Sequence, residues 1–300
     1  MSGCTRRSGL AAALTPLALG PWMHVRATEP LQVVYPAPES PRDERFGDMV
    51  ALLREALTRT EARHGPFVLR PHTQHLTQPR QLLELELDQS LSVQWSATTL
   101  EKEQRLLPVR FPTRRGLLGF RLAFIQRQRQ AEFRRVRNLE DLRRFTLGQG
   151  ATWVDTEILR SQGLRVEIGH YEGLFKMLAA GRFDLFPRGV NEIFTEFTAR
   201  QLEAPALAIE DSLALHYPMP YYFFFNRRNA ALARRVESGL QTMLRDGSFE
   251  QHFWTFHGPA VRRARLSERR LIRLANPYLP PLTPMQQLPL WFNPERVPGL

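Results

Sequence analysis

Apolar residues recur with the spacing of a helix in some segments of this chain and with the spacing of a strand in others. Two parts of the chain repeat the same order of such segments. At residues 46–58, apolar residues recur every three or four positions, which is typical of an amphipathic helix. Short alternating or apolar runs on either side are typical of strands. The first part therefore reads strand, helix, strand, helix, strand at residues 31–35, 46–58, 67–69, 79–88 and 91–95.

The second part repeats this order at residues 145–147, 152–161, 164–168, 171–180 and 183–186. Thr152 and Asp155 have the spacing of a capping box, and Gly163 and Gly181 are expected to end the two helices. Strands that alternate with helices of this length predict parallel sheets with right-handed crossovers. The predicted fold class is therefore α/β, built as two similar halves.

The first 27 residues have the pattern of a secretory signal peptide. Arg6 and Arg7 precede an apolar run at residues 10–19, and Ala27 is the expected cleavage residue. An uncleaved anchor is the alternative, although the run is too short to span a bilayer. We therefore expect a periplasmic protein with residues 1–27 removed.

Cleavage would also change the composition of the chain. Cys4 is the only cysteine, so the mature protein would have no disulfide, no thiolate metal site and no cysteine nucleophile. The formal charge falls from +11 to about +8, because three arginines leave with the signal peptide. The densest basic tract, at residues 127–144, contains acidic residues and a single aromatic one, which predicts a solvated surface and no nucleic-acid partner.

The expected carboxyl ends of the second-half strands carry the strongest candidate binding groups. Arg188 follows the strand at 183–186, and Gly150, Thr152 and Trp153 lie in a turn between a strand and a helix. Parallel α/β sheets bind ligands at this edge, where an arginine beside a helix N-terminus would attract an anion. A surface arginine after a turn proline is the alternative interpretation of Arg188.

Cofactor and metal signatures are missing from the sequence. The glycines spell neither a dinucleotide-binding nor an NTP-binding fingerprint. His72 and His75 are three residues apart, but no carboxylate in the same segment completes a ligand set. We expect no cofactor and no metal.

The carboxy-terminal third carries a resemblance to a known family. The segment 216–258 has a strand, a helix with the pattern xxLaxxvxxxLxxlxxdG, and an aromatic-rich end that closes on Gly258. With the order of elements before it, this segment resembles the type 2 periplasmic solute-binding proteins, the family 3 amino-acid-binding kind that serve ABC importers. The resemblance implies two lobes, each a mostly parallel sheet flanked by helices, joined by two hinge strands.

The resemblance also implies a division of the chain. Lobe I would comprise residues 28–118 and 213–258, and lobe II would comprise residues 119–212. The hinge strands would lie near residues 117–125 and 206–213. Residues 259–300 depart from the family, and we expect them to form a strap packed on lobe I, with a partner-docking segment as the alternative.

Family positions suggest ligand contacts in both lobes. The family's Thr-x-x-Arg is matched by Thr99 and Lys102, with Thr98 beside them, so a cation is kept without the bidentate fork. The glycine–threonine turn is matched by Gly150 and Thr152.

The second lobe departs from the family after Asp184, which we expect to be structural. Arg188 and Gly189 stand where amino-acid binders place an acidic residue, and Glu192 could supply the negative group instead. Tyr35, Trp95 and Trp153 are candidates for an aromatic wall.

The resemblance implies a monomeric binding protein that captures a small anionic or zwitterionic solute, amino-acid-like or an organic acid, for an ABC permease or a membrane sensor. The alternative is an enzyme on the same fold, a lyase like the cyclohexadienyl dehydratases. That chemistry needs a poised carboxylate or histidine, and no paired arrangement stands out in the sequence. We therefore expect binding without catalysis.

Overall fold

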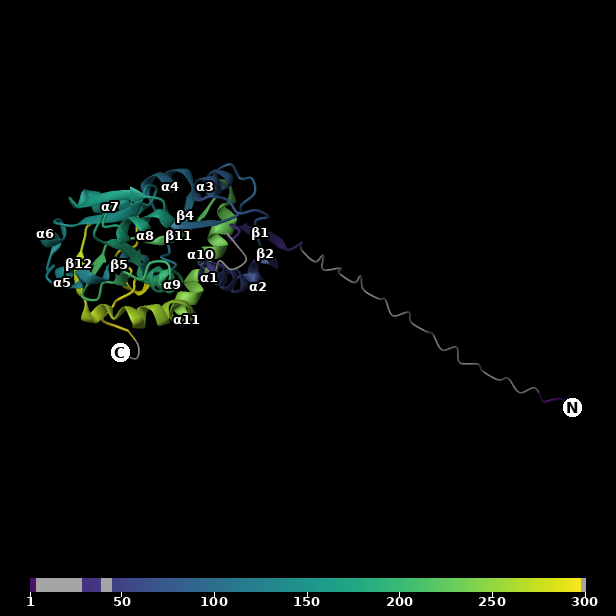
Figure 1. Ribbon diagram of the computed structural model, residues 1–300. Helices are drawn as coiled ribbons and strands as arrows, with labels where there is room; N and C mark the ends of the chain where they lie inside the picture. Colours follow the sequence, from purple (N-terminus) through teal and green to yellow (C-terminus); the bar gives the residue numbers. More distant parts are fainter. Residues whose placement is uncertain (4–28, 39–44, 298–300) are drawn as a thin grey trace.

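The computed structural model describes residues 1–3, 29–38 and 45–297. Figure 1 shows them as two adjoining groups of strands and helices. The predicted signal peptide lies, apart from residues 1–3, outside the described residues, so it stays a prediction. Within the described part of the chain, none of the helices has the length and apolar character needed to cross a membrane.

The first sheet group contains a parallel pair and a three-stranded antiparallel sheet. β1 (Leu31–Tyr35) pairs in parallel with β2 (Phe67–Pro71). The second sheet has β11 (Tyr221–Phe225) between β3 (Gln94–Ala97) and β4 (Leu107–Val109), antiparallel to both. All five residues of β11 are buried, as expected for a central strand covered on both faces.

Among the described residues, five helices belong to the first sheet group. Their bounds are α1 (Gly47–Thr58), α2 (Glu61–His64), α3 (Gln78–Glu86), α4 (Leu100–Arg105) and α10 (Ala230–Arg245), the last after a 3₁₀ turn η3 (Arg227–Asn229). α1 and α10 pack closely, because a Cβ on Gly239 of α10 would collide with the backbone of Ala56 in α1.

The second sheet group is built around a long buried strand. β5 (Phe120–Gln126) lies between β10 (Leu213–His216) and β8 (Phe186–Gly189), antiparallel to both, and it also pairs with β9 (Leu207–Ile209). β12 (Arg270–Arg273) extends this sheet by pairing in parallel with β10.

A separate parallel pair, β6 (Thr146–Gly150) and β7 (Arg165–Gly169), joins β8 through a bridge between Leu147 and Leu185. The remaining elements of this part of the chain are η1 (Leu117–Gly119), η2 (Arg127–Arg129), α5 (Gln130–Phe133), α6 (Leu139–Leu142), α7 (Val154–Ser161), α8 (Tyr171–Ala179), α9 (Val190–Arg200), α11 (Ser248–Ala264), η4 (Leu266–Glu268) and η5 (Leu288–Leu290).

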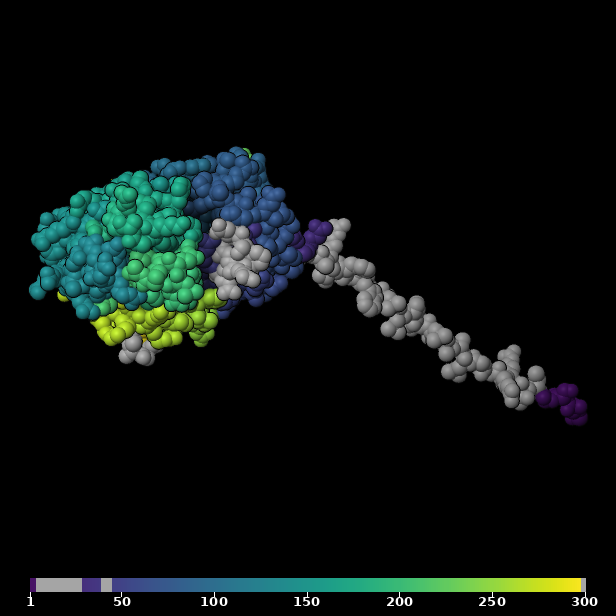
Figure 2. Space-filling model, in the orientation of Figure 1, coloured from purple at the N-terminus to yellow at the C-terminus, as the bar shows by residue number. Residues whose placement is uncertain are grey.

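Two crossover segments connect the sheet groups, at residues 110–119 and 217–220. They lie side by side, because the N–H of Tyr217 donates to the carbonyl of Gly119 over 3.2 Å. Leu118, Tyr217 and Met219 are buried in a hydrophobic cluster that continues into both groups. Figure 2 shows the two groups in direct contact, with α11 (yellow-green) along the lower edge.

The repeated parallel pairs, β1 with β2 and β6 with β7, agree with the predicted α/β fold. Gly163 and Gly181 do end helices, each with a positive φ. The second crossover lies at 217–220, because β10 still pairs with β5 in the second sheet group. It therefore comes a few residues after the boundary expected at 213.

The tail also differs from the strap expected on lobe I. α11 continues through Pro259 to Ala264, and β12 adds a strand to the sheet of the second group. The alternating side chains of residues 270–273 suit an edge strand, with Ile272 buried and Arg273 exposed.

Two local predictions are corrected. The last strand of the second half spans Phe186–Gly189 instead of 183–186, so Arg188 lies inside a strand, opposite Leu122 of β5. Pro187 tolerates this place because β8 lies at the end of the order β12–β10–β5–β8, where a residue without an N–H is accepted. α7 begins at Val154 with Trp153 as its N-cap, so Thr152 does not cap it.

Candidate functional site

The carboxyl ends of the parallel pairs, β1 in the first sheet group and β6 in the second, are the edges at which α/β sheets bind ligands. At the end of β1, the ring of Tyr35 stacks on Trp95, with centroids 6.0 Å apart and planes inclined by 30°. Phe46, the N-cap of α1, also lies 6.0 Å from Trp95. The three rings form an aromatic wall at one edge of the first sheet group.

Arg114 lies beside this wall in the first crossover segment. Its guanidinium is over the rings of Phe46 and Tyr221, 5.5 and 5.1 Å from their centroids. Its Nε and Nη2 donate to the two carboxylate oxygens of Asp48 over 2.6 and 2.7 Å. Only 3% of Arg114 is exposed, so this ion pair is buried.

Asp48 is held ionised by its surroundings. Burial opposes its charge, but the charge of Arg114 and the hydrogen bonds from His257 and Arg114 bring the pKa of Asp48 well below its usual value. His257 Nε2 lies 3.2 Å from Asp48 Oδ2. Burial lowers the pKa of His257, and the contact with Asp48 only partly opposes this shift.

Arg188 is held by an equivalent set of groups in the second sheet group. Its Nε and Nη2 donate to the carboxylate of Glu196 over 2.8 and 2.6 Å. Glu192 Oε2 lies 3.3 Å from Nη2, and the guanidinium is 4.6 Å from the centroid of Trp153. The sequence suggested that Arg188 binds an anionic group of a ligand or is a surface arginine, but Arg188 is buried and α9 supplies carboxylate partners four and eight residues later.

Arg121, which sequence reasoning missed, lies on β5 between these clusters. Its Nη2 is 2.6 Å from Asp155 Oδ1 in the first turn of α7, and Tyr217 donates its hydroxyl to the same oxygen. Its Nη1 is 3.5 Å from Glu192. Its Nε is buried without a partner. An arginine inside the apolar run GFRLAFI was the available signal, because such a charge is kept in a core only when it is paired.

Glu192 joins Arg188 and Arg121 in one cluster. Burial opposes its ionisation, but Arg188, Arg121 and the N–H of Gly189 lower its pKa. Its charge also contributes to the raised pKa of Arg114, after the larger effect of Asp48, and of Tyr221, after the larger effect of burial. Its contacts with arginine are the longest in the cluster and 30% of its side chain is exposed. Glu192 is therefore the carboxylate best placed to change partners.

Neither a protein-family model nor a curated protein matches the chain. Solved structures do match. The probable amino-acid ABC transporter extracellular-binding protein ytmK of Bacillus subtilis is 16% identical, with a TM-score of 0.54, over 77% of this chain and 100% of ytmK.

Two further structures match to a similar extent. A periplasmic binding protein of Salmonella typhimurium with high arginine specificity is 14% identical, with a TM-score of 0.52, over 76% of this chain and 98% of its own. A histidine kinase sensor domain similar to periplasmic binding proteins is 16% identical, with a TM-score of 0.51, over 77% of this chain and 97% of its own. This chain has the two-lobed fold of the type 2 periplasmic solute-binding proteins.

We call the first sheet group lobe I and the second lobe II. In lobe II the structure brings together four of the predicted site residues. The ring of Trp153 packs so closely on Gly150 that a Cβ there would lie 2.5 Å from it, and Arg188 and Glu192 complete the set. Thr152 is exposed, and the hydroxyl of Thr156 bonds the Gly150 carbonyl instead.

The predicted residues of lobe I fall into two places. Tyr35 is part of the aromatic wall. Thr98, Thr99 and Lys102 surround the start of α4, where Thr98 donates to Glu103 and Thr99 caps the helix. The ammonium of Lys102 donates to the carbonyl of Ala97 over 2.8 Å, and burial lowers the pKa of Lys102 to about 8.

Asp184, which the sequence assigned a structural role, pairs with Arg129 and accepts from the N–H of Thr146. His72 is bonded to the backbone of Gln74. Among the described residues, no three histidine, cysteine, aspartate or glutamate side chains are grouped so that they could hold a metal ion.

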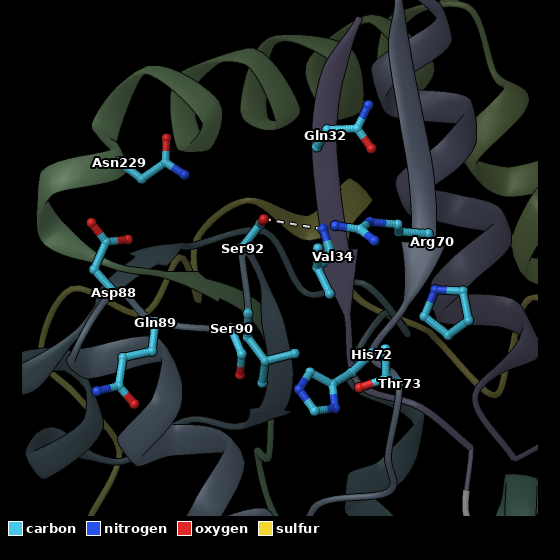
Figure 3. Close-up of a pocket in the computed structure, with 12 residues that line it drawn as sticks. Gln32, Val34, Arg70, His72, Thr73, Asp88, Gln89, Ser90, Ser92 and Asn229 are labelled. Carbon is cyan, nitrogen blue, oxygen red and sulfur yellow. Dashed lines mark hydrogen bonds between the residues drawn. The ribbon is translucent and has the colours of Figure 1, made fainter.

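A separate open groove of about 430 Å³ lies on lobe I, beside β1 and β2. Figure 3 shows Arg70 reaching toward Val34, with Asp88 and Asn229 across the groove. The hydroxyl of Ser92 accepts from the N–H of Val34 at its floor. None of the nine predicted site residues lines this groove, which is distinct from the charged cluster between the lobes.

Proposed function

We propose that this protein is an exported solute-binding protein that captures a small amino-acid-like solute between its two lobes, for an ABC importer or a membrane sensor. The observation that carries the proposal is the cluster around Glu192 of lobe II, whose Oε2 lies 3.3 Å from Arg188 and 3.5 Å from Arg121 and whose side chain is 30% exposed. The fold supports it, and so do the neighbours, which are described as an amino-acid transporter component, an arginine-binding protein and a sensor domain.

The charges favour a zwitterion among the anionic and zwitterionic solutes considered from the sequence. Three arginines of the cluster already have carboxylate partners, Asp48 for Arg114, Asp155 for Arg121 and Glu196 for Arg188. An added anion would leave an uncompensated charge in a buried place, which is costly. A zwitterion adds no net charge.

Partner exchange at Glu192 would accommodate such a solute. The solute's carboxylate would take the contacts that Arg188 and Arg121 now make with Glu192, and Glu192 would instead pair with the solute's ammonium. The aromatic wall of Tyr35, Trp95 and Phe46 would contact the solute from lobe I, since flat rings contribute area with little loss of side-chain freedom.

The first experiment is mass spectrometry of small molecules released from the purified protein by denaturation. Calorimetry then compares the wild type with Glu192→Gln, and Glu167→Gln on the exposed face of β7 is the control for loss of one negative charge. A charge-assisted hydrogen bond contributes about 1.5–3 kcal/mol, so Glu192→Gln should bind roughly ten- to a hundredfold more weakly.

Binding should also raise the melting temperature of the wild type, since the solute binds only the folded state. The proposal fails if no amino acid or organic acid is released and none shifts the melting temperature. Turnover of a released compound by the purified protein would favour the lyase instead.

A further inference from the structure

Beyond the two crossover segments, the chain joins the lobes a third time through α11. Near the start of this helix, Phe249 packs edge-on against Phe111 of the first crossover segment, with centroids 4.7 Å apart. Near its end, Val261 and Ala264 are buried in a cluster with α8 and α9 of lobe II. The chain then enters β12 in the sheet of lobe II.

The tail beyond α11 is fastened to the second crossover segment. β12 lies along β10, and the N–H of Leu274 donates to the carbonyl of His216 over 2.8 Å. One step further, the side-chain amide of Asn276 donates to the carbonyl of Pro218 over 2.9 Å. Residues 270–276 of the tail therefore contact residues 213–218, the segment that leads from β10 of lobe II into the second crossover.

The same tail returns to the first crossover segment. The N–H of Phe292 donates to the carbonyl of Arg115 over 2.7 Å, and its ring packs on Phe120 with centroids 5.4 Å apart. Trp291 lies against Gly116, whose φ is +69°, and a Cβ on Gly116 would come within 2.5 Å of the indole. Phe292 is 6% exposed, so this contact is a packed one.

We propose that residues 265–297 form a hinge brace that limits how far the two lobes open. Domain closure in two-lobed proteins depends on changes in backbone angles at a few connecting residues. Here the first connection carries a backbone hydrogen bond and packed rings from the tail, and the second carries the side-chain hydrogen bond of Asn276 beside the β10–β12 pairing. A change at either connection must therefore break the tail contacts or move the tail with it. This inference goes beyond the proposed function, because it concerns the lobes with or without a solute.

The test measures the distance between the lobes in the absence of any solute. Cys4 is the only cysteine, so a Cys4→Ser chain accepts two spin labels at exposed positions, Arg234→Cys on α10 and Glu167→Cys on β7. Double electron–electron resonance is then recorded for the full chain, for the brace variant Trp291→Ala/Phe292→Ala, and for Tyr278→Ala, an exposed aromatic residue of the same tail.

We expect a narrow distance distribution in the labelled chain and in Tyr278→Ala, and a distribution that is broader or shifted by several ångströms in the brace variant. Circular dichroism checks that the brace variant is folded. A folded brace variant with an unchanged distribution overturns the proposal. If the protein binds no solute but the distance distribution broadens in the brace variant, the proposed function is refuted and the proposal of a hinge brace stands.

Hydrogen exchange on the unmodified chain covers the case in which the brace variant does not fold. The amides of Phe292 and Gly119, both hydrogen-bonded within the braced region, should then be protected to the same degree. Exchange at Phe292 that is a hundredfold faster than at Gly119 would show that the tail detaches while the crossover stays closed, and would overturn the proposal.

Discussion

Arg114 in the first crossover segment and Arg188 in lobe II are buried guanidiniums held over aromatic rings by carboxylates, but their partners lie at different distances along the chain. Arg114 pairs with Asp48, 66 residues earlier, in the first turn of α1. Arg188 pairs with Glu192 and Glu196 on α9, the helix that begins directly after its own strand. One pair is tertiary, and the other is almost local.

Because of this difference, we expect the Arg114 pair to contribute mainly to stability and the Arg188 cluster mainly to binding. The Asp48–Arg114 pair holds α1 to the first crossover segment, and His257 extends it to α11, so several distant segments depend on it. The Arg188 cluster fixes the turn between β8 and α9. Glu192 in this cluster is 30% exposed, so its contact with Arg188 is the one that a solute could replace. We therefore expect substitutions at the two arginines to affect different measurements.

The largest effect is expected for Arg114→Met, which keeps the aliphatic packing and removes the charge. Asp48 would be left buried with His257 as its remaining partner, and breaking a buried ion pair from one side costs about 3–5 kcal/mol. Urea denaturation should show this loss in the free energy of unfolding.

The matched control for this prediction is Arg234→Met, on an exposed position of α10, which should change stability by no more than about 0.5 kcal/mol. Equal stability of Arg114→Met and Arg234→Met would contradict the tertiary role of the Asp48 pair.

Arg188→Met should destabilise less and affect binding more. Glu196 keeps the hydroxyl of Tyr171 at 3.0 Å, and Glu192 keeps Arg121 and the N–H of Gly189, so we expect a loss of about 2 kcal/mol. Affinity for the released solute should fall roughly ten- to a hundredfold. Arg188→Met/Glu196→Gln should recover part of the stability without recovering the affinity. Unchanged affinity would assign Arg188 a purely structural role.

The sequence predicts the parts of this fold that depend on local pattern. The parallel pairs and the glycine ends of two helices follow from periodicity and punctuation. The predicted bounds of strand β8 are wrong, because Pro187, Arg188 and Gly189 have the pattern of a turn and their pairing with β5 depends on a distant part of the chain. Pairing between distant strands is a property that a single sequence does not display.

The site was predicted less completely, for the same reason. Arg188, Trp153, Gly150 and Glu192 are close in sequence or follow neighbouring strands, and the structure does bring them together. Asp48 and Arg114 were missed, because their meeting depends on how α1 packs on the crossover. Lys102 was placed by family resemblance, but its ammonium turns to Ala97.

Acid should lower the free energy of unfolding in part through His257, which contacts Asp48 in the Arg114 cluster. Burial lowers the pKa of His257 and brings the pKa of His216 to about 4, so the unfolded chain binds these protons first as the pH falls below about 6.5. Stability should therefore fall with decreasing pH, by at most about 1.4 kcal/mol per pH unit for each histidine.

His257→Gln should reduce the slope of stability against pH between about 6 and 5, measured by urea denaturation at each pH. His170→Gln, on an exposed residue before α8, is the control and should keep the full slope. An identical slope in His257→Gln would mean that His257 takes up its proton equally in the folded and unfolded chains.

The smallest expected effect compares the rings. The Arg188 guanidinium is 4.6 Å from the centroid of Trp153, and the Arg114 guanidinium is 5.5 Å from that of Phe46. Because indole has the most negative face of the aromatic side chains and the distance is shorter, the Trp153–Arg188 contact should be the stronger, at about 1 kcal/mol. Double-mutant cycles of Trp153→Leu with Arg188→Met and of Phe46→Leu with Arg114→Met measure each coupling free energy separately from the loss of apolar area. A larger coupling at Phe46 would show that burial of the tertiary pair, and not the identity of the ring, determines the strength of these contacts.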